Sequence, residues 1–310
     1  MKRLVFLLLA LPLGVKGQSQ INITAAAQNI MLFNPAYAGA ENDLNFSLIH
    51  KSQWAGQPNS PVITGFSAHM PVNYERVGVG VNLLRESAGI VQSLYANGSL
   101  SYKINFHRGR LSFGIRLGVL QRTEQVSKLL IKDQGDVLAV DQYELSPDYS
   151  GGLFYKEKKY YVGLSFTRSA GVYLEQHAAL KNYYTFIAGT NFSLSRHLVF
   201  KPFVISKYTQ EFNPTVMVML PVEYQKLISI GVGYNTSSVL SVQSTLSLNK
   251  LLGASESTYS ITYSYDQSIN RNNNYIGNTH EITLSIRLVP GEKLDRINKR
   301  KVTVSPLLFN

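Results

Sequence analysis

Alternation of apolar and polar residues with a period of two is the feature that most limits how this chain can fold. In the stretch 281–288, EITLSIRL, the even-numbered positions are apolar and the odd-numbered positions are polar or charged. Successive side chains point to opposite faces of a β-strand, so such a strand has one apolar and one polar face. The pattern recurs through most of residues 44–288, and no long helical pattern competes with it. The sequence therefore predicts an all-β fold.

The number of alternating segments and the lengths of their connections predict a membrane barrel. About fourteen segments alternate, each close to the ~9–11 residues that a tilted membrane strand needs. Short connections such as 107–109 and 156–158 occur between longer ones such as 127–146, 169–181 and 266–279. Outer-membrane barrels have short periplasmic turns and longer outer loops. We therefore expect a transmembrane antiparallel β-barrel of about fourteen strands in a bacterial outer membrane, with both termini in the periplasm.

Composition agrees with this class of protein. The mean hydropathy of the chain is close to zero, which excludes a helical membrane protein but fits a barrel, whose lipid-facing and lumen-facing residues average out. The net charge of +11 is expected to serve contacts with lipopolysaccharide and a periplasmic partner. No basic helix or aromatic-basic motif of nucleic-acid-binding proteins occurs, so nucleic acid is not an expected partner. The absence of cysteine fits an oxidising envelope compartment.

The N-terminal part of the chain divides into two segments before the alternation starts. Residues 1–17 have basic residues followed by an apolar run too short to span a bilayer, and we interpret them as a signal peptide. Residues 18–43 lack alternation, and we expect them to form a periplasmic or lumen segment. Phe33 and Tyr37 are its expected apolar anchors, folded into or beneath the barrel.

The barrel is expected to span residues 44–288 and to be followed by a tail. Residues 289–310 are rich in basic side chains and lack a sustained strand pattern. Two interpretations of this tail remain open: a simple periplasmic extension, or a docking segment for a periplasmic partner.

The sequence offers few candidates for catalytic or metal-binding residues. The six histidines are scattered, and neither the HExxH nor the GxSxG motif occurs. Acidic residues in the stretch 127–146 lack the glycine-centred spacing of a calcium loop. We expect no catalytic residue, metal or cofactor. Four charged residues are expected to point into the lumen, where they could pair with one another: Lys103, Arg116, Glu281 and Arg287.

Five short motifs resemble those of a known family. They are Phe33-Asn34-Pro35-Ala36-Tyr37-Ala38-Gly39, His50-Lys51-Ser52-Gln53-Trp54, Gly78-Val79-Gly80, Ala88-Gly89-Ile90 and Leu111-Ser112-Phe113-Gly114. In this order they resemble the PorP/SprF family of the Bacteroidetes type IX secretion and gliding motility machinery. The chain departs from the acidic-Pro-x-Phe opening of that family, because residues 18–24 contain none.

The resemblance implies a function. Such proteins are outer-membrane barrels without known enzymatic activity, and they support export or cell-surface anchoring of a secreted, adhesin-type protein with a C-terminal sorting domain. Periplasmic or outer-membrane components of the secretion system are the other implied partners. Two alternatives remain open: a passive channel or hydrophobic-solute transporter, and a surface hydrolase embedded in a barrel.

Candidate partner-binding residues come from the family-like motifs and from aromatic residues of the long loops, because aromatic side chains are enriched at binding hot spots. The motifs could instead form only turns before the first strand, and the loops could only shield the barrel mouth. The candidates are Phe33, Asn34, Pro35, Tyr37, Gly39, Gln53, Trp54, Tyr143, Tyr173 and Tyr275.

Overall fold

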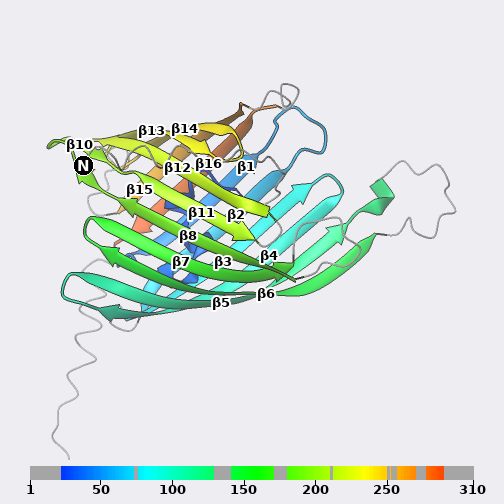
Figure 1. Cartoon of the computed structure of the whole chain (residues 1–310), viewed down its shortest axis with the longest axis horizontal. Helices are drawn as coiled ribbons and strands as arrows, with labels where there is room; N and C mark the ends of the chain where they lie inside the picture. Colours follow the sequence, from blue (N-terminus) through cyan, green and yellow to red (C-terminus); the bar gives the residue numbers. More distant parts are fainter. Residues whose placement is uncertain are drawn as a thin grey trace, which may run out of the picture.

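The computed structural model describes residues 22–72, 76–128, 141–170, 180–209, 212–249, 252, 257–269 and 277–289 of the chain. Sixteen strands form one antiparallel sheet (Figure 1). They are β1 (Leu44–Ser52), β2 (Val62–Val72), β3 (Val77–Ala88), β4 (Val91–Asn105), β5 (Gly109–Glu124), β6 (Gln142–Glu157), β7 (Tyr160–Ala170), β8 (Leu180–Thr190), β9 (Phe192–Ser193), β10 (Leu198–Phe200), β11 (Phe203–Thr209), β12 (Phe212–Tyr224), β13 (Ile228–Asn235), β14 (Val239–Ser247), β15 (Thr258–Ser268) and β16 (Thr279–Leu288).

The sheet closes on itself. Strand β1 pairs with β2 on one side and with β16 on the other, and β11 pairs with β12 as well as with β8. The short strands β9 and β10 pair with each other beyond β8 and β11, so they prolong two strands rather than adding two. Fourteen strands therefore run around the barrel, which confirms the fold that the alternation predicts.

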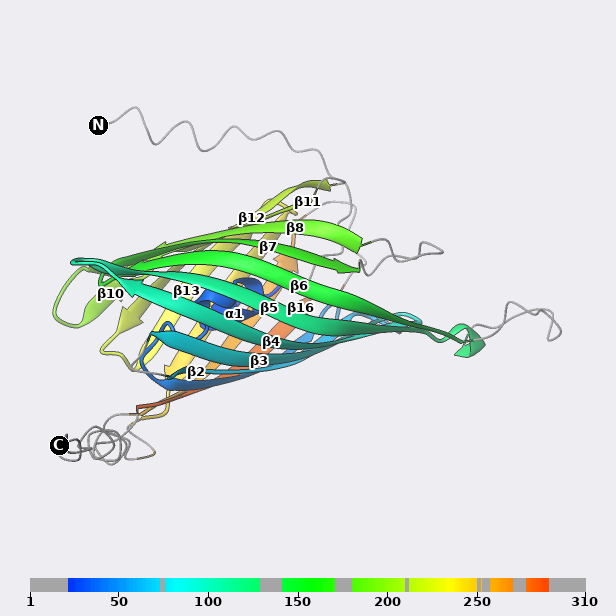
Figure 2. The ribbon, with the colours of Figure 1, turned by 90° about the horizontal axis from the view of Figure 1, so that it is seen from below.

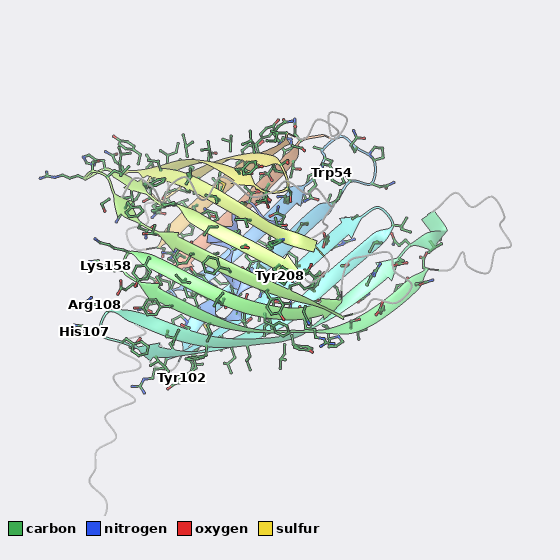
Figure 3. All side chains as sticks on the ribbon, viewed as in Figure 1. Trp54, Tyr102, His107, Arg108, Lys158 and Tyr208 are labelled. Carbon is green, nitrogen blue, oxygen red and sulfur yellow. The ribbon has the colours of Figure 1, made fainter. Side chains whose placement is uncertain are left out.

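The two ends of the barrel carry different connections. We call the end that holds connections 53–61, 125–141, 171–179 and 269–278 the loop end. The opposite end, with 73–76, 106–108 and 158–159, is the turn end. Length does not separate the two ends completely. The connection 248–257 is long and lies at the turn end, whereas 89–90, 210–211 and 236–238 are short and lie at the loop end. Figure 3 places Trp54 at the loop end and His107, Arg108 and Lys158 together at the turn end.

Inner and outer faces follow the alternation. In β5, Ile115 and Leu117 point outward and are 55% and 66% exposed, whereas Ser112 and Arg116 point inward and are buried. Exposed tyrosines lie near both ends of the strands, such as Tyr102 near the turn end and Tyr208 near the loop end (Figure 3). An apolar outer band between aromatic girdles is what a lipid bilayer requires of a barrel. Separately, none of the helices in the described residues combines the length and apolar character needed to cross a membrane.

Residues 22–43 lie inside the barrel, and we call them the plug. They contain three short helices: η2 (Ala26–Gln28), α1 (Ile30–Phe33) and η3 (Pro35–Tyr37). A further short helix, η4 (Val126–Lys128), follows β5. Figure 2 shows α1 enclosed by the strands. The largest buried apolar cluster joins plug residues such as Ile23, Ile30 and Phe33 to wall residues such as Ile187 and Met219. The main apolar core is therefore inside the barrel, between plug and wall.

The plug crosses the lumen from one end to the other. Thr24 contacts Asp266, which lies near the loop end of β15, whereas Asp43 directly precedes β1 at the turn end. The last described residue, Val289, follows β16 at the turn end. The two ends of the described chain thus lie at opposite ends of the barrel. The expected periplasmic location of both termini concerns residues outside the described ones and stays a prediction.

Candidate functional site

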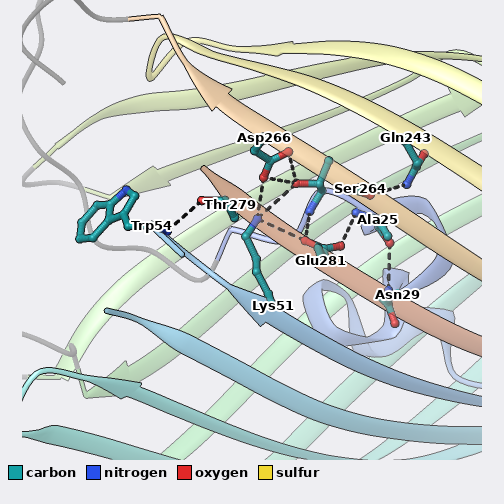
Figure 4. Close-up of polar contacts among 10 residues, drawn as sticks. Ala25, Asn29, Lys51, Trp54, Gln243, Ser264, Asp266, Thr279 and Glu281 are labelled. Atoms are coloured by element: carbon teal, nitrogen blue, oxygen red, sulfur yellow. Dashed lines mark hydrogen bonds and ion pairs between the residues drawn. The ribbon is translucent and has the colours of Figure 1, made fainter. Parts of the chain in front are cut away.

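A buried ion-pair cluster holds the loop-end part of the plug (Figure 4). Lys51 Nζ lies 3.0 Å from Asp266 Oδ2 and 3.2 Å from Glu281 Oε2. The backbone N–H groups of Thr24 and Ala25 donate to the two oxygens of Glu281 at 2.8 and 2.7 Å. The Thr24 hydroxyl donates to Asp266 at 2.7 Å. We call these five residues the upper anchor.

The upper anchor balances its charges by using the plug as a hydrogen-bond donor. Lys51, Asp266 and Glu281 have side chains that are 3%, 9% and 1% exposed, so water does little to screen them. One ammonium faces two carboxylates, and plug N–H and O–H groups supply the additional donors that the second carboxylate needs. Charge-assisted hydrogen bonds of this kind are stronger than neutral ones. The wall therefore presents a receptor for the plug backbone, assembled from the first strand and the last two.

Asn34 holds the middle of the plug against two neighbouring strands. Its side-chain oxygen accepts the N–H of Ala36 and so caps η3. Its side-chain nitrogen donates to the carbonyl oxygens of Leu153 in β6 and Leu164 in β7, at 2.9 and 3.1 Å. Asn34 is 1% exposed, so both ends of its amide are satisfied within the protein, as a buried polar group requires.

Carbonyl oxygens of the plug receive hydrogen bonds from inward-facing wall residues. The last carbonyls of a helix lack partners within the helix. Arg116 donates to the oxygen of Leu32 at 2.8 Å, and Ser165 donates to that of Phe33 at 2.7 Å. Further toward the turn end, Ser101 donates to Ala38 at 2.7 Å, and Lys103 donates to Gly39. Polar wall residues thus satisfy these four carbonyl oxygens of the plug.

Glycines in the wall let the plug backbone approach closely. A Cβ atom at Gly114 would lie 2.2 Å from the Ala36 nitrogen, and one at Gly78 would lie 2.0 Å from the Ala38 oxygen. Separations under 3.0 Å are impossible without movement of one partner, so only glycine fits at these two positions. The motifs Gly78-Val79-Gly80 and Leu111-Ser112-Phe113-Gly114 are therefore explained by contact with the Pro35–Gly39 part of the plug.

A second group of charged residues holds the plug at the turn end, and we call it the lower anchor. Glu41 pairs with Lys156 and accepts the Tyr37 hydroxyl at 3.2 Å. Asp43 lies 3.8 Å from Arg287. Burial alone would raise the pKa of Glu41, but Lys156 and Arg287 outweigh it, so the pKa lies below its ordinary value. Burial also raises the pKa of the Tyr37 phenol. Glu41 is therefore ionised when it holds the plug.

The family-like signature lies inside the barrel. Phe33, Asn34, Pro35 and Gly39 are buried, and the partly buried Tyr37 packs edge-on against His69 and Phe154. These candidate partner-binding residues contact the lumen wall in this structure, and none of them is exposed.

The remaining candidates lie at the loop end. Trp54 is 42% exposed and has a left-handed φ of 51°. Its backbone N–H donates to the Thr279 hydroxyl at 3.4 Å. The neighbouring Gln53 is half-buried. Tyr143 is 72% exposed and lies near the start of β6 rather than in a loop. Tyr173 and Tyr275 lie outside the described residues.

The four predicted lumen charges do not pair with one another. Lys103, Arg116 and Glu281 are buried and contact plug backbone, as described above, while Arg287 is 45% exposed beside Asp43. The plug stands between them, and its carbonyl, N–H and carboxylate groups take the place of cross-lumen partners. Sequence reasoning missed Lys51 and Asp266. The available signal was their position on the polar face of the first strand and of the second-last strand.

A cavity of about 330 Å³ remains between the plug and the wall. Plug residues Gln28 and Met31 and wall residues such as Asn45, Thr258 and Arg287 line it. These wall residues lie near the turn ends of their strands, so the cavity is on the turn-end side of the plug. Among the described residues, no group of three or more histidine, aspartate or glutamate side chains could hold a metal ion.

Comparison with known proteins identifies one family. The family described as type IX secretion system membrane protein PorP/SprF matches residues 15–286. No match was found among the curated proteins.

Several solved structures are similar in part. CdiB from Acinetobacter baumannii has 10% identity and a TM-score of 0.44, with 79% of this chain and 59% of that chain covered. The Pseudomonas putida toluene transporter TodX has 9% identity and a TM-score of 0.45, with 88% of this chain and 95% of that chain covered. The A. baumannii outer membrane protein Omp33 has 6% identity and a TM-score of 0.43, with 80% of this chain and 98% of that chain covered. This chain therefore spans about three fifths of CdiB.

Proposed function

Because the chain belongs to the PorP/SprF family of type IX secretion system membrane proteins, we propose that it is a closed outer-membrane scaffold rather than a conduit. It supports export or cell-surface anchoring of a secreted, adhesin-type protein with a C-terminal sorting domain. The secreted protein binds at the loop end, which faces the cell exterior, and the turn end meets periplasmic components of the secretion system. The scaffold carries out no chemical reaction.

The observation that carries this proposal is the filled lumen. A passive channel needs a continuous path, whereas here the plug crosses the barrel and is held at both ends and in the middle. Its anchors use buried charges and backbone groups, and the wall glycines are shaped to its backbone. Releasing such a segment would remove the N–H groups that donate to Glu281 and the carboxylate that pairs with Lys156. Each lost hydrogen bond to a charged group costs about 1.5–3 kcal/mol. A static plug therefore supports a binding role over solute passage.

The loop end offers the surface that a large partner would need. Its described residues include the exposed aromatic side chains of Trp54 and Tyr143. Outer-membrane barrels place their longer loops outside the cell, so this orientation lets a surface protein reach both residues. The turn end carries His107, Arg108 and Lys158 (Figure 3), and a basic rim there suits acidic periplasmic surfaces.

A disulfide that locks the plug tests the scaffold against the channel. The Ser47 hydroxyl donates to the Asn29 side-chain oxygen at 2.5 Å, so the side chains of β1 and the plug meet here. The natural chain has no cysteine, and the double variant N29C/S47C therefore offers a single possible disulfide. It would replace the wild-type protein in the bacterium that carries the gene, and surface display of the secreted proteins would be measured in oxidised and reduced cells.

If the protein is a scaffold, the locked variant supports display of the secreted proteins as well as the wild type does. Neither protein then conducts ions in planar bilayers. A channel predicts that the lock abolishes function and that reduction restores it. Loss of display in oxidised cells with recovery on reduction would overturn the proposal. Deleting the gene must reduce display of at least one secreted protein, and if it does not, the assignment of an export or anchoring role is wrong.

A further inference from the structure

The cavity between the plug and the wall forms a vestibule at the turn end of the barrel. Its volume of about 330 Å³ falls within the range of about 300–1,000 Å³ that is typical of ligand sites. Plug residues 27–31 lie between it and the loop end, and the wall lines it with Lys156, Lys201 and Arg287 among others. These three side chains are 34%, 37% and 45% exposed, so solvent reaches the vestibule.

The wall separates the vestibule from the lipid. The interruptions between β8 and β9 and between β10 and β11 border the vestibule, because Asn191, Lys201 and Pro202 line it. Backbone hydrogen bonds bridge both interruptions. The Asn191 N–H donates to the Lys159 oxygen at 2.7 Å, and the Lys201 N–H donates to the Pro221 oxygen at 2.9 Å. The described wall is closed here, so an occupant enters from the turn end.

Three hairpin tips beside the vestibule carry an excess of positive charge. They are residues 157–159 at the β6–β7 turn, 195–197 at the β9–β10 turn and 225–227 at the β12–β13 turn. We call their exposed cations the basic tips: Lys158, Lys159, Arg196 and Lys226. Figure 3 places Lys158 at the turn end. The Gln225 N–H donates to the His197 oxygen at 2.7 Å, which joins two of these hairpins just as the bond from Asn191 to Lys159 joins the other pair.

The positive charge of the basic tips is not balanced by the acids around it. Inside the vestibule, Lys156 and Lys201 already pair with Glu41 and Glu223. In the three tips, the four cations are accompanied by one acidic residue, Glu157. Charges of one sign at the mouth of a cleft with low-dielectric walls attract ligands of the opposite sign. The vestibule therefore suits an occupant with negative charge.

The charge and the closed wall select among the possible occupants. A second copy of this chain would bring an equally basic turn end, and like charges repel each other. Residues 292–301 of this chain hold five basic and two acidic side chains, so they are basic as well. Anionic lipid headgroups can reach the outer side of the tips, but the wall separates them from the vestibule. An acidic segment of another protein fits both the tips and the vestibule.

We propose that the vestibule and the basic tips bind an acidic segment of a periplasmic protein. Carboxylates of this segment pair with the basic tips, and one end of the segment enters the vestibule beside polar wall residues such as Ser229 and Thr245. The inference rests on the proposed function, in which the turn end faces the periplasm. It names the site and the chemical character of the periplasmic partner.

Charge reversal tests the basic tips. The purified full-length barrel, in nanodiscs of zwitterionic lipid, is titrated with a fluorescent oligoglutamate peptide, and oligolysine is the control peptide. Lys158→Glu, Arg196→Glu and Lys226→Glu each reverse the charge of one tip. The matched control is Arg85→Glu, because Arg85 is also exposed but lies near the loop end of β3.

Binding of oligoglutamate should depend on the tips and on salt. Each reversal at a tip weakens binding about twofold to fivefold, and the triple variant weakens it at least about tenfold, because exposed ion pairs are lost. Arg85→Glu leaves binding unchanged, and oligolysine does not bind. Added salt weakens binding to the wild type, since it screens exposed charges. In cells, the triple variant reduces surface display of the secreted protein, and Arg85→Glu does not.

Filling the vestibule tests the cavity separately from the charge. Ser229 of β13 lines the vestibule, and Ser229→Trp occupies part of its volume without changing any charge. The matched control is Ile230→Trp, because Ile230 is the next residue of β13 and is 56% exposed on the outer face. Heat-modifiability gels show that both barrels fold. Ser229→Trp should weaken oligoglutamate binding about tenfold, and Ile230→Trp should leave it unchanged.

Four results would overturn the inference alone. The wild type does not bind oligoglutamate, Arg85→Glu weakens binding as much as the reversals at the tips, or Ser229→Trp binds like the wild type. In the fourth, the triple variant changes the association of the barrel with phosphatidylglycerol and not its binding of the peptide, which assigns the tips to the membrane. The proposed function fails separately, when deletion of the gene leaves surface display of every secreted protein unchanged.

Discussion

Lys51 and Glu281 face each other across the seam where the first and last strands of the barrel meet. They are direct register partners in β1 and β16, and their charged groups lie 3.2 Å apart on the inner face. Glu281 also accepts hydrogen bonds from the backbone N–H groups of Thr24 and Ala25, near the start of the described plug. One carboxylate therefore joins barrel closure to plug binding.

Replacing Glu281 by alanine should destabilise the folded protein and free the plug. The change leaves the N–H groups of Thr24 and Ala25 buried without their acceptor, and breaking a buried pair costs about 3–5 kcal/mol. We expect unfolding at a lower temperature in heat-modifiability gels and faster protease cleavage of the plug. Thr283→Val is the control, since the Thr283 hydroxyl is buried without a hydrogen-bond partner in the described residues. Equal behaviour of the two variants would contradict the role of Glu281.

A methyl group at Gly114 should displace the plug while the barrel remains closed. Its Cβ atom would lie 2.2 Å from the Ala36 nitrogen, and overpacking of this kind costs about 1–3 kcal/mol. Gly114→Ala should therefore conduct ions in planar bilayers, unlike the wild type. The matched control is Gly151→Ala in β6, where an added Cβ meets nothing within 4 Å. A Gly114→Ala barrel that conducts no ions would show that the plug has room to shift without opening a path through the lumen.

A charge at Leu284 should impair membrane insertion. Leu284 is 43% exposed on the outer face, in a row with Leu48 of β1 and Ile261 of β15. An arginine on the lipid face near the midplane costs about 2–4 kcal/mol. We expect Leu284→Arg to reduce the fraction of folded barrel recovered from lipid vesicles, and Leu284→Phe to leave it unchanged. Equal recovery would mean that the outer face does not contact lipid at this height.

Acidification should weaken the lower anchor. Because the pKa of Glu41 is lowered in the folded protein from its ordinary value of 4.5, the carboxylate stabilises the fold above pH 4.5, and this contribution is lost as the pH falls through the lowered pKa. Glu41→Gln should thus be less stable than the wild type at neutral pH. The difference in unfolding temperature should shrink as the pH drops below 4.5. A difference that stays constant down to pH 2 would exclude ionised Glu41 as an anchor.

Cysteine labelling should establish which end of the barrel faces out. The wild-type chain has no cysteine, so each single-cysteine variant has only one thiol that can be labelled. In intact cells, a membrane-impermeant maleimide should label Trp54→Cys at the loop end and leave Arg108→Cys at the turn end unlabelled until the outer membrane is permeabilised (Figure 3). The reverse pattern would invert the orientation and transfer the partner surface to the other end.

The alternation of residues predicts the strands well because it reports a local property, namely which side chains face lipid. The alternation predicts less well where a strand is interrupted. The stretches 182–194 and 197–208 alternate in sequence, but each is broken in the structure, by Asn191 and by Lys201–Pro202, and their tips form the β9–β10 hairpin. Pro202 cannot donate to a ladder, which places a break there. The proline is visible in the sequence, but the β-strand pairing it interrupts is not.

The anchors of the plug are harder to predict than the wall. Phe33 and Tyr37 signal a packed segment because two aromatic residues occur where alternation is absent. The contact between Thr24 and Glu281, by contrast, joins residues separated by 257 positions. It depends on the closing register of β1 with β16 and on the direction in which the plug crosses the lumen. Neither quantity is encoded in the local pattern of apolar and polar residues, so the upper anchor emerges only from the three-dimensional fold.

The position of the upper anchor also constrains the order of assembly. Residues 22–25 lie inside the closed cylinder, at the end opposite to the start of β1. We expect the plug to be in place before β1 pairs with β16, because Glu281 of β16 bonds both the plug and Lys51 of β1. Glu281 completes its pairs only when both the plug and the first strand have arrived. A barrel without its plug therefore lacks the hydrogen bonds from Thr24 and Ala25 to Glu281 that stabilise the closed sheet.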